Sequence, residues 1–356
     1  MPFLTISLVN FRNLSNKPID LSAPEVFLIG KNGQGKTNLL ESLYIASYGN
    51  SFRTRTDSEI YTTGTNEYSI RAMYKAEKTD SISIISKNGK KQIEKNLKKI
   101  RSRKDLVNAI PCVLFFHNDL DFVVGSPERR RFFIDQSLSM YNPFYLDLLQ
   151  KYTVLLKTKN KEIKEQKRVL LDSLDVQIAS VGFEIISYRK KTIDEFNTIF
   201  SDIYEKVSGI DNVRIEYKPS WKHSSAEEVM AHLAARREKD ILLGTCMSGP
   251  HRDKIHFVRN NELFISTAST GQLRLISLVL RTAQALFFTK ITGKLPILLM
   301  DDVLLELDPD KRKSFTDLLP KYDQLFCTFL PGEPYKKYAK EKTLIYFVSN
   351  GEFHAE

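Results

Sequence analysis

The 356-residue sequence has few cysteines and lacks a long uninterrupted hydrophobic segment. Its three cysteines, Cys112, Cys246 and Cys327, lie far apart and form no C-x-x-C pair, so neither a disulfide framework nor a zinc site is predicted. No segment approaches the roughly 18 consecutive apolar residues of a membrane span, and the N-terminal residues lack the pattern of a signal peptide. We therefore expect a protein of the reducing cytosol that is neither secreted nor embedded in a membrane.

Acidic residues are outnumbered, with 43 Asp and Glu against 53 Lys and Arg, which gives a formal net charge of +10. This excess favours a polyanionic partner such as nucleic acid, but a basic protein without such a partner explains the charge equally well. Nine Lys or Arg residues lie between Lys87 and Lys104, and a second basic cluster spans Arg129 to Arg131. For each cluster, DNA contact and a solvated surface stay open, and Arg129 to Arg131 could instead brace a nucleotide site.

Glycine is scarce, with 15 residues in the chain, but three of them fall within the segment GKNGQGKT at residues 30–37. This segment fits the pattern G-x-x-x-x-G-K-[ST], whose backbone N–H groups and following helix N-terminus bind phosphates. The apolar strand pattern EVFLIG precedes it, and Leu39, Leu40 and Leu43 follow at helical spacing, which argues against a simple surface turn. The predicted ATP-binding residues are Gly30, Lys31, Asn32, Gly33, Gln34, Gly35, Lys36, Thr37 and Asn38.

Two acidic residues follow the apolar segment ILLM near the C-terminus and complete the predicted chemistry. We expect Lys36 to reach the β and γ phosphates and Thr37 to offer a hydroxyl to Mg²⁺, which also requires a carboxylate. Asp301 lies where a buried strand ends, the edge at which α/β sheets bind ligands, and is the predicted metal ligand. Asp302 is predicted to orient or deprotonate the attacking water. The alternative is a solvated acidic turn after a core strand.

A third candidate element is the start of an amphipathic helix in the segment STGQLRLISLVL. Ser269 and the N–H groups around Gly271 and Gln272 could bind a further phosphate at the N-terminus of this helix. An ordinary helix cap is the competing interpretation, and it is the better one when the segment is taken alone.

Strand and helix patterns divide the chain into three stretches. The segment SISIISKNGKK predicts a strand that ends at an Asn88-Gly89 hairpin turn, and IPCVLFF predicts another strand. Long helical patterns with almost no glycine or proline then run from about Pro127 to Ser208. We therefore expect an α/β nucleotide-binding fold in two parts, residues 1–117 and 244–356, interrupted by a compact, mainly helical lobe at residues 118–243.

Six sequence blocks resemble a known group of proteins in residues and in order. They are LVNFRNL, YGNSFRT, GSPERRRFFID, SGPHRDK, STGQLR and DDVLLELD. The pattern resembles the ABC-type ATPase heads of the SMC, Rad50 and RecF group, and within this group it is similar to the RecF family over essentially the whole chain. The resemblance implies an ABC-type P-loop ATPase head with a mixed sheet.

The resemblance also implies how such a head works. Two heads would dimerise with ATP between them, so that Ser269, Gly271 and Gln272 of one subunit act on ATP bound to the other. Asp308 would lie in the D-loop at the dimer interface. Members of the family bind duplex DNA, favour junctions between single- and double-stranded DNA, and help to load recombinase at gaps together with RecR and RecO.

Three positions depart from the group's pattern. Leu305 replaces a frequent Ser in the D-loop, and the Q-loop region has no Gln, which leaves Asn118 or Asp119 for the magnesium-water contact. Thr328 stands in place of the switch histidine of ABC transporters, which favours slow hydrolysis. A weak DNA-stimulated ATPase is thus expected. A non-hydrolysing ATP-dependent clamp or scaffold and a transport-type ATPase head stay open as alternatives.

Overall fold

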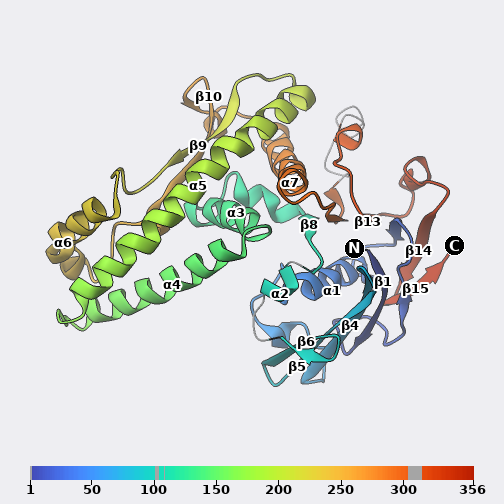
Figure 1. Ribbon diagram of the computed structural model, residues 1–356. Helices are drawn as coiled ribbons and strands as arrows, with labels where there is room; N and C mark the ends of the chain where they lie inside the picture. The colour runs from blue at the N-terminus through green and yellow to red at the C-terminus, as the bar shows by residue number, and fades with distance from the viewer. Residues whose placement is uncertain (1, 101–103, 108, 304–314) are drawn as a thin grey trace. The chain divides into compact units, whose positions relative to one another are not determined.

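The computed structural model describes residues 2–100, 104–107, 109–303 and 315–356, and the chain forms two compact units (Figure 1). The first unit combines Met1–Asn118 with Gln284–Glu356, and the second is Asp119–Ala283. The predicted lobe at residues 118–243 lies almost entirely within the second unit. The sequence pattern assigns residues 244–283 to the head, but they belong to the second unit. The reason is that the strand at Lys254–Arg259 pairs with the strand at Val213–Lys218, which lies within the lobe.

A mixed six-stranded sheet in the first unit places the ends of its parallel strands at one edge. The strand order is β15-β14-β3-β13-β12-β8, and only β15 is antiparallel to its neighbour. Strands β3, β8, β12 and β13 are buried throughout, as expected for apolar strands covered on both faces. The bounds are β3 Glu25–Ile29, β8 Cys112–Phe115, β12 Ile297–Met300, β13 Gln324–Phe329, β14 Thr343–Ser349 and β15 Glu352–Ala355.

A second, antiparallel sheet in the same unit has the order β2-β1-β4-β5-β6-β7. Asn88 and Gly89 both have positive φ, at 49° and 74°, so the predicted hairpin turn between β5 and β6 is confirmed. The helix α1, Lys36–Tyr48, contacts strands of both sheets and shares one hydrophobic core with them. The other bounds are β1 Phe3–Val9, β2 Ile19–Asp20, β4 Glu67–Lys75, β5 Thr79–Lys87, β6 Lys90–Lys95, β7 Lys98–Lys99 and α2 Lys104–Val107.

The second unit is mainly helical, as predicted, and contains a small three-stranded antiparallel sheet of order β11-β10-β9. The side chains of Ser126, Asn142 and Ser225 cap the N-termini of α3, α4 and α6, which explains where these helices begin. The bounds are α3 Pro127–Ser139, α4 Pro143–Lys164, α5 Leu171–Ser208, β9 Val213–Lys218, α6 Ala226–Leu243, β10 Lys254–Arg259, β11 Glu262–Leu263 and α7 Thr270–Thr292, which continues into the first unit.

A buried arginine holds the core of the second unit together. Arg189 on α5 donates to both oxygens of Asp135, to Asp253 and to the carbonyl of Pro250 at distances of 2.7–2.9 Å. Asp253 also accepts hydrogen bonds from the hydroxyl of Tyr217 and from a backbone N–H, so this buried carboxylate is well satisfied. The SGPHRDK block therefore contributes to the packing of the helical unit.

The arginine cluster Arg129 to Arg131 is divided between two environments. Arg130 donates to the carbonyls of Ile255 and Gly125, and Arg131 donates to the carbonyl of Asp253 at 2.7 Å. The Arg129 side chain is 56% exposed and lies 3.9 Å from the carboxylate of Asp121. These contacts favour a structural role in the second unit for Arg130 and Arg131, whereas Arg129 alone of the three is left as a candidate for DNA contact.

Among the described residues, one helix, α7, has the length and the apolar composition that a membrane span requires. However, 72% of its most apolar stretch is buried within the protein, as in the core helix of a globular domain.

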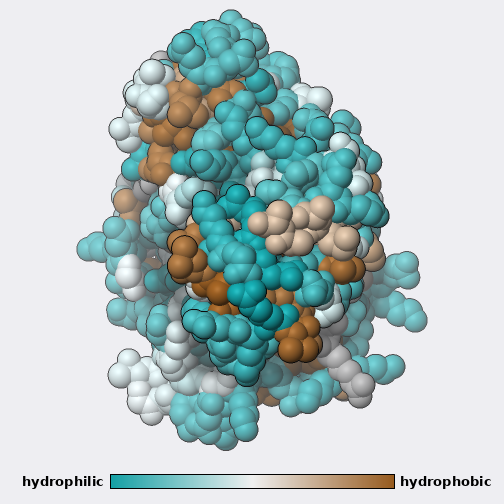
Figure 2. Space-filling model, turned by 90° about the vertical axis from the view of Figure 1, so that its left-hand side faces the viewer, coloured by the Kyte–Doolittle hydropathy of each residue, from teal (hydrophilic) through white to brown (hydrophobic). Residues whose placement is uncertain are grey.

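The surface at the left-hand side of Figure 1 carries hydrophobic groups interrupted by hydrophilic residues (Figure 2). Exposed apolar side chains of the second unit include Val169 and Leu242.

Candidate nucleotide site

The predicted phosphate loop connects β3 to α1, so the strand-loop-helix arrangement expected from the sequence is present. Gly33 and Gly35 have φ values of 78° and 121°, which a residue with a side chain rarely adopts. An added Cβ at Gly35 would lie 2.6 Å from the Cδ2 of Leu14, and one at Gly30 would lie 2.5 Å from the carbonyl oxygen of Val348. Backbone conformation therefore requires glycine at position 33, close packing requires it at position 30, and both apply at position 35.

Two surface turns of the first unit support the phosphate loop. The N–H of Gly351 donates to the carbonyl of Gln34 at 2.9 Å, and the N–H of Asn350 donates to its side-chain oxygen at 2.8 Å. The side-chain amide of Asn13 donates to the carbonyl of Gly33 at 3.0 Å. Gln34 is thus a supporting residue of the loop, because its side chain is engaged by the turn between β14 and β15. The sequence pattern did not identify either turn.

Lys36 lies inside the loop with only 4% of its surface exposed. Its ammonium donates to the carbonyl of Gly30 at 2.6 Å and to that of Lys31 at 3.3 Å. An ammonium has three hydrogens, so a third donor is available for a phosphate oxygen. Lys31 and Asn32 are exposed at the tip of the loop.

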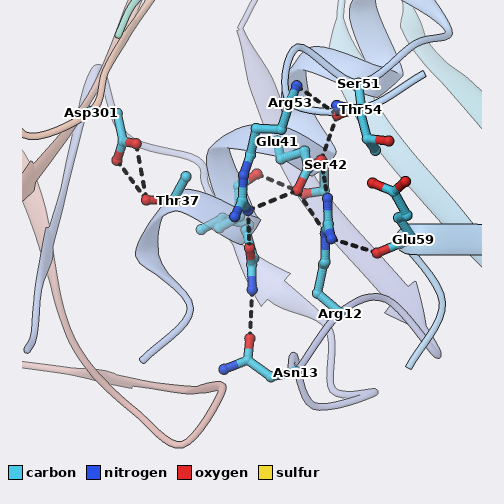
Figure 3. A network of polar contacts seen from close by, with 12 residues as sticks. Arg12, Asn13, Thr37, Glu41, Ser42, Ser51, Arg53, Thr54, Glu59 and Asp301 are labelled. Carbon is cyan, nitrogen blue, oxygen red and sulfur yellow. Dashed lines mark hydrogen bonds and ion pairs between the residues drawn. The ribbon is translucent and has the colours of Figure 1, made fainter. Parts of the chain in front are cut away.

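Thr37 and Asp301, which are 264 positions apart in the chain, meet at the edge of the mixed sheet (Figure 3). The Thr37 hydroxyl lies 3.0 Å from Oδ1 and 2.9 Å from Oδ2 of Asp301. Burial, and then the neighbouring charge of Asp302, raise the pKa of the Asp301 carboxyl to about 6. A carboxylate and a hydroxyl are hard oxygen ligands that suit Mg²⁺, which keeps several waters and takes phosphate oxygens as its other ligands. The residues present therefore fit the predicted metal.

Asp302 is held beside Asp301 by Thr328 of β13. The Thr328 hydroxyl lies 2.7 Å from Oδ1 of Asp302 and 3.3 Å from Oδ1 of Asp301, and the N–H of Asp302 donates to the same hydroxyl at 2.8 Å. Asp302 has a φ of 52°, a conformation that Asp and Asn adopt more readily than other non-glycine residues. The residue in place of the switch histidine is thus a direct neighbour of both carboxylates.

The start of α7 has the geometry of a helix cap. The N–H of Ser269 donates to the side-chain oxygen of Gln272 at 2.7 Å, and the N–H of Gln272 donates to the Ser269 hydroxyl at 3.3 Å. This reciprocal pair is a capping box. Ser269 and Gly271 are exposed, and an added Cβ at Gly271 would meet nothing within 4 Å. These residues belong to the second unit, whereas the phosphate loop and Asp301 belong to the first.

The two Q-loop candidates differ sharply in environment. Asp119 is 3% exposed, and its carboxylate accepts from Arg281 of α7 at 2.7 and 3.1 Å. The Arg281 guanidinium lies 4.8 Å from the centre of the Phe122 ring. Asn118 is exposed. Asp119 is therefore the weaker candidate for the magnesium-water contact. Two D-loop positions of the sequence analysis, Leu305 and Asp308, lie outside the described residues.

Comparisons with known proteins agree over the whole chain. The family model for the RecF/RecN/SMC N terminal domain matches residues 3–353. The DNA replication and repair protein RecF of Treponema pallidum (strain Nichols) is 63% identical over 98% of this chain and 100% of its own length. RecF of Clostridium botulinum (strain Okra / Type B1) is 33% identical over 98% of each chain.

Two solved structures with a similar fold differ in their sequence identity to this chain. A structure of the recombination mediator protein RecF with ATP, in the RecFOR pathway, has a TM-score of 0.91 and 26% identity over 100% of this chain and 97% of that one. An Smc head bound to the C-terminal winged-helix domain of ScpA has a TM-score of 0.58 and 15% identity over 99% and 96%, which shows a likeness of fold alone.

Proposed function

Since this chain belongs to the RecF family of DNA replication and repair proteins, we propose that it is an ATP-dependent DNA-binding protein of recombinational repair and replication restart. It would act in the cytoplasm as an ATP-driven homodimer on duplex DNA and on junctions between single- and double-stranded DNA. There it would assist recombinase loading at gaps with RecR and RecO. The observation that carries the ATP-dependent part is the contact between Thr37 and Asp301, which joins the phosphate loop to the acidic pair that follows β12.

Each residue of the site has a separate role in this proposal. The loop amides and Lys36 bind the phosphates, and Thr37 and Asp301 hold Mg²⁺, which supplies positive charge to the phosphate oxygens. Asp302 orients the attacking water, and Thr328 fixes the carboxylate of Asp302 through the 2.7 Å hydrogen bond. A hydroxyl in this place cannot carry a positive charge as a histidine can, which is consistent with slow hydrolysis.

The basic stretch from Lys87 supplies a candidate DNA surface on the antiparallel sheet. Lys91 and Lys95 form ion pairs with Asp57 and Asp80, so part of their charge is compensated within the unit. The side chains of Lys90, Lys98 and Lys99, on β6 and β7, are exposed. Exposed lysines of this kind contact phosphates without reading sequence, and binding through them weakens steeply with salt.

The proposal is tested by measuring mass and DNA affinity together. Light scattering is performed with ATP and with ADP, each with and without duplex DNA, and DNA affinity is measured over a series of salt concentrations. We expect dimers with ATP, monomers with ADP, and a steeper salt dependence for the dimer, because it contacts more phosphates. DNA binding that is equal with ATP and ADP would contradict the proposed coupling. Single-turnover hydrolysis with and without DNA separates a slow ATPase from a non-hydrolysing clamp.

Asp302→Asn should slow ATP hydrolysis and prolong the ATP-bound dimer. The substitution keeps the size of the side chain and suits the positive φ of 52°, but it removes the charge that would orient or deprotonate water. General-base catalysis contributes on the order of 100-fold or more to a rate, so a loss of this size is expected in single-turnover assays. Hydrolysis at the wild-type rate would show that Asp302 has no role in activating water.

A further inference from the structure

Two of the sequence blocks without an assigned role, LVNFRNL and YGNSFRT, meet on one buried carboxylate in the first unit (Figure 3). Glu41 lies on α1, four residues after Thr37, and its side chain is fully buried. Arg12 of the first block binds it with two nitrogens, at 2.8 and 3.0 Å. From the second block, Ser51 donates to it at 2.5 Å and Arg53 at 3.2 Å.

The same two blocks also form a chain of hydrogen bonds that ends on the phosphate loop. Arg53 Nη1 donates to the side-chain oxygen of Asn38 at 2.7 Å, and the amide of Asn38 donates to the side-chain oxygen of Asn13 at 2.7 Å. Asn13 in turn donates to the carbonyl of Gly33. Each amide is thereby fixed in one orientation, because its oxygen accepts from one neighbour while its nitrogen donates to the next.

The loop that carries Arg53 is attached to the rest of the first unit by an apolar contact and by polar contacts. The Phe52 ring packs against Tyr44 and Phe116, with centroid distances of 5.4 and 4.9 Å, and anchors the loop in the core. The guanidinium of Arg53 makes polar contacts with Glu41 and Asn38, and 36% of its side chain is exposed. Removing the guanidinium therefore cuts the hydrogen-bond chain without disturbing the apolar anchor.

We propose that Arg53 is a positioning residue that acts on the phosphate loop through Asn38 and Asn13. Glu41 holds the Arg53 guanidinium in the position that this role requires. A flexible loop must lose conformational freedom when phosphates bind, and a carbonyl held from behind reduces this cost before the ligand arrives. Arg53 needs no contact with the nucleotide for this role. The inference rests on the proposed ATP site, because it assigns a support to that site.

The test compares Arg53→Ala with Arg55→Ala, a matched control from the same loop. Arg55 is exposed and makes no hydrogen bond or ion pair among the residues that the structure describes. We expect Arg53→Ala to raise the Kd for ATP about fivefold, the equivalent of one hydrogen bond, whereas Arg55→Ala leaves it unchanged. In the nucleotide-free protein, hydrogen exchange at residues 31–35 should be faster in Arg53→Ala only.

A double variant tests whether Arg53 and Asn13 support ATP binding through one chain of hydrogen bonds or independently of each other. If Arg53 acts through Asn13, then Asn13→Ala combined with Arg53→Ala should bind ATP no more weakly than the weaker single variant. Independent contributions would multiply, which gives about 25-fold if Asn13→Ala alone also raises the Kd about fivefold. A multiplicative result, or equal ATP affinity and exchange in Arg53→Ala and Arg55→Ala, overturns the inference. Failure of the wild-type protein to bind ATP overturns the proposed function instead, and the exchange experiment without nucleotide keeps the two outcomes apart.

Discussion

Lys36→Ala should raise the Kd for ATP by roughly 100-fold or more, the largest effect expected for a single side chain of this site. Lys36 lies inside the loop with 4% of its surface exposed, and its ammonium is within 2.6 Å of the Gly30 carbonyl. In the proposed site its remaining N–H donates a charge-assisted hydrogen bond to a phosphate oxygen, about twice as strong as a neutral one, and its charge acts on both the β and γ phosphates. Isothermal calorimetry with ATP and with ADP measures the loss.

A matched control for this substitution removes the same charge far from the loop in sequence. Lys342 is exposed, and Lys342→Ala should bind ATP with wild-type affinity. Lys36→Arg should still bind ATP but should not complete the ATPase cycle, because the larger planar group keeps the charge without the geometry of the ammonium. An unchanged ATP affinity in Lys36→Ala, in a protein that circular dichroism shows to be folded, would refute the assignment of the phosphate loop.

The local part of the nucleotide site could be predicted from sequence because its determinants are close together in the chain. The spacing of Gly30, Gly35 and Lys36 specifies a loop between a strand and a helix, and that arrangement is confirmed. The pairing of Thr37 with Asp301 follows from a general rule, since parallel strands end at one edge of a sheet. Neither inference needed knowledge of side-chain packing.

The supports of the site could not be predicted, because they depend on which surface turns lie against the loop in three dimensions. The contact of Asn350 with Gln34 joins residues 316 positions apart, and no local pattern marks it. No sequence pattern distinguishes Arg12 and Glu41 from other charged residues, and only the fold shows that they form an ion pair. Similarly, the sequence leaves the role of Arg129 to Arg131 open between DNA contact, a solvated surface and a brace for the nucleotide site, and only the fold shows that Arg131 donates to the backbone carbonyl of Asp253.

Ser269→Arg should leave ATP binding intact and prevent ATP-dependent dimerisation. In a dimer with ATP between two heads, Ser269 of one subunit would lie at the γ phosphate bound to the other, and a long side chain there would block closure. Gly30, Lys36 and Thr37 belong to the first unit, so their own binding of ATP should not change. Light scattering with ATP should therefore give the mass of a monomer, and calorimetry should give the wild-type affinity expected for a single head.

Ser269→Ala is the matched control, because the structure gives this serine a second role. Its hydroxyl accepts from the N–H of Gln272, and losing this cap costs about 1 kcal/mol of helix stability in either variant. Only Ser269→Arg adds bulk, so a difference in assembly between the two variants reports on the dimer interface and not on the cap.

DNA binding gives an independent measure of ATP-dependent dimerisation. Dimerisation roughly doubles the number of phosphates contacted, and the salt dependence of affinity scales with that number. Ser269→Arg with ATP should therefore bind duplex DNA more weakly and with a shallower salt slope than Ser269→Ala. If Ser269→Arg still dimerises with ATP and retains the steep slope, the role of Ser269 across the interface is wrong, and the reciprocal hydrogen bonds with Gln272 account for this segment as a helix cap alone.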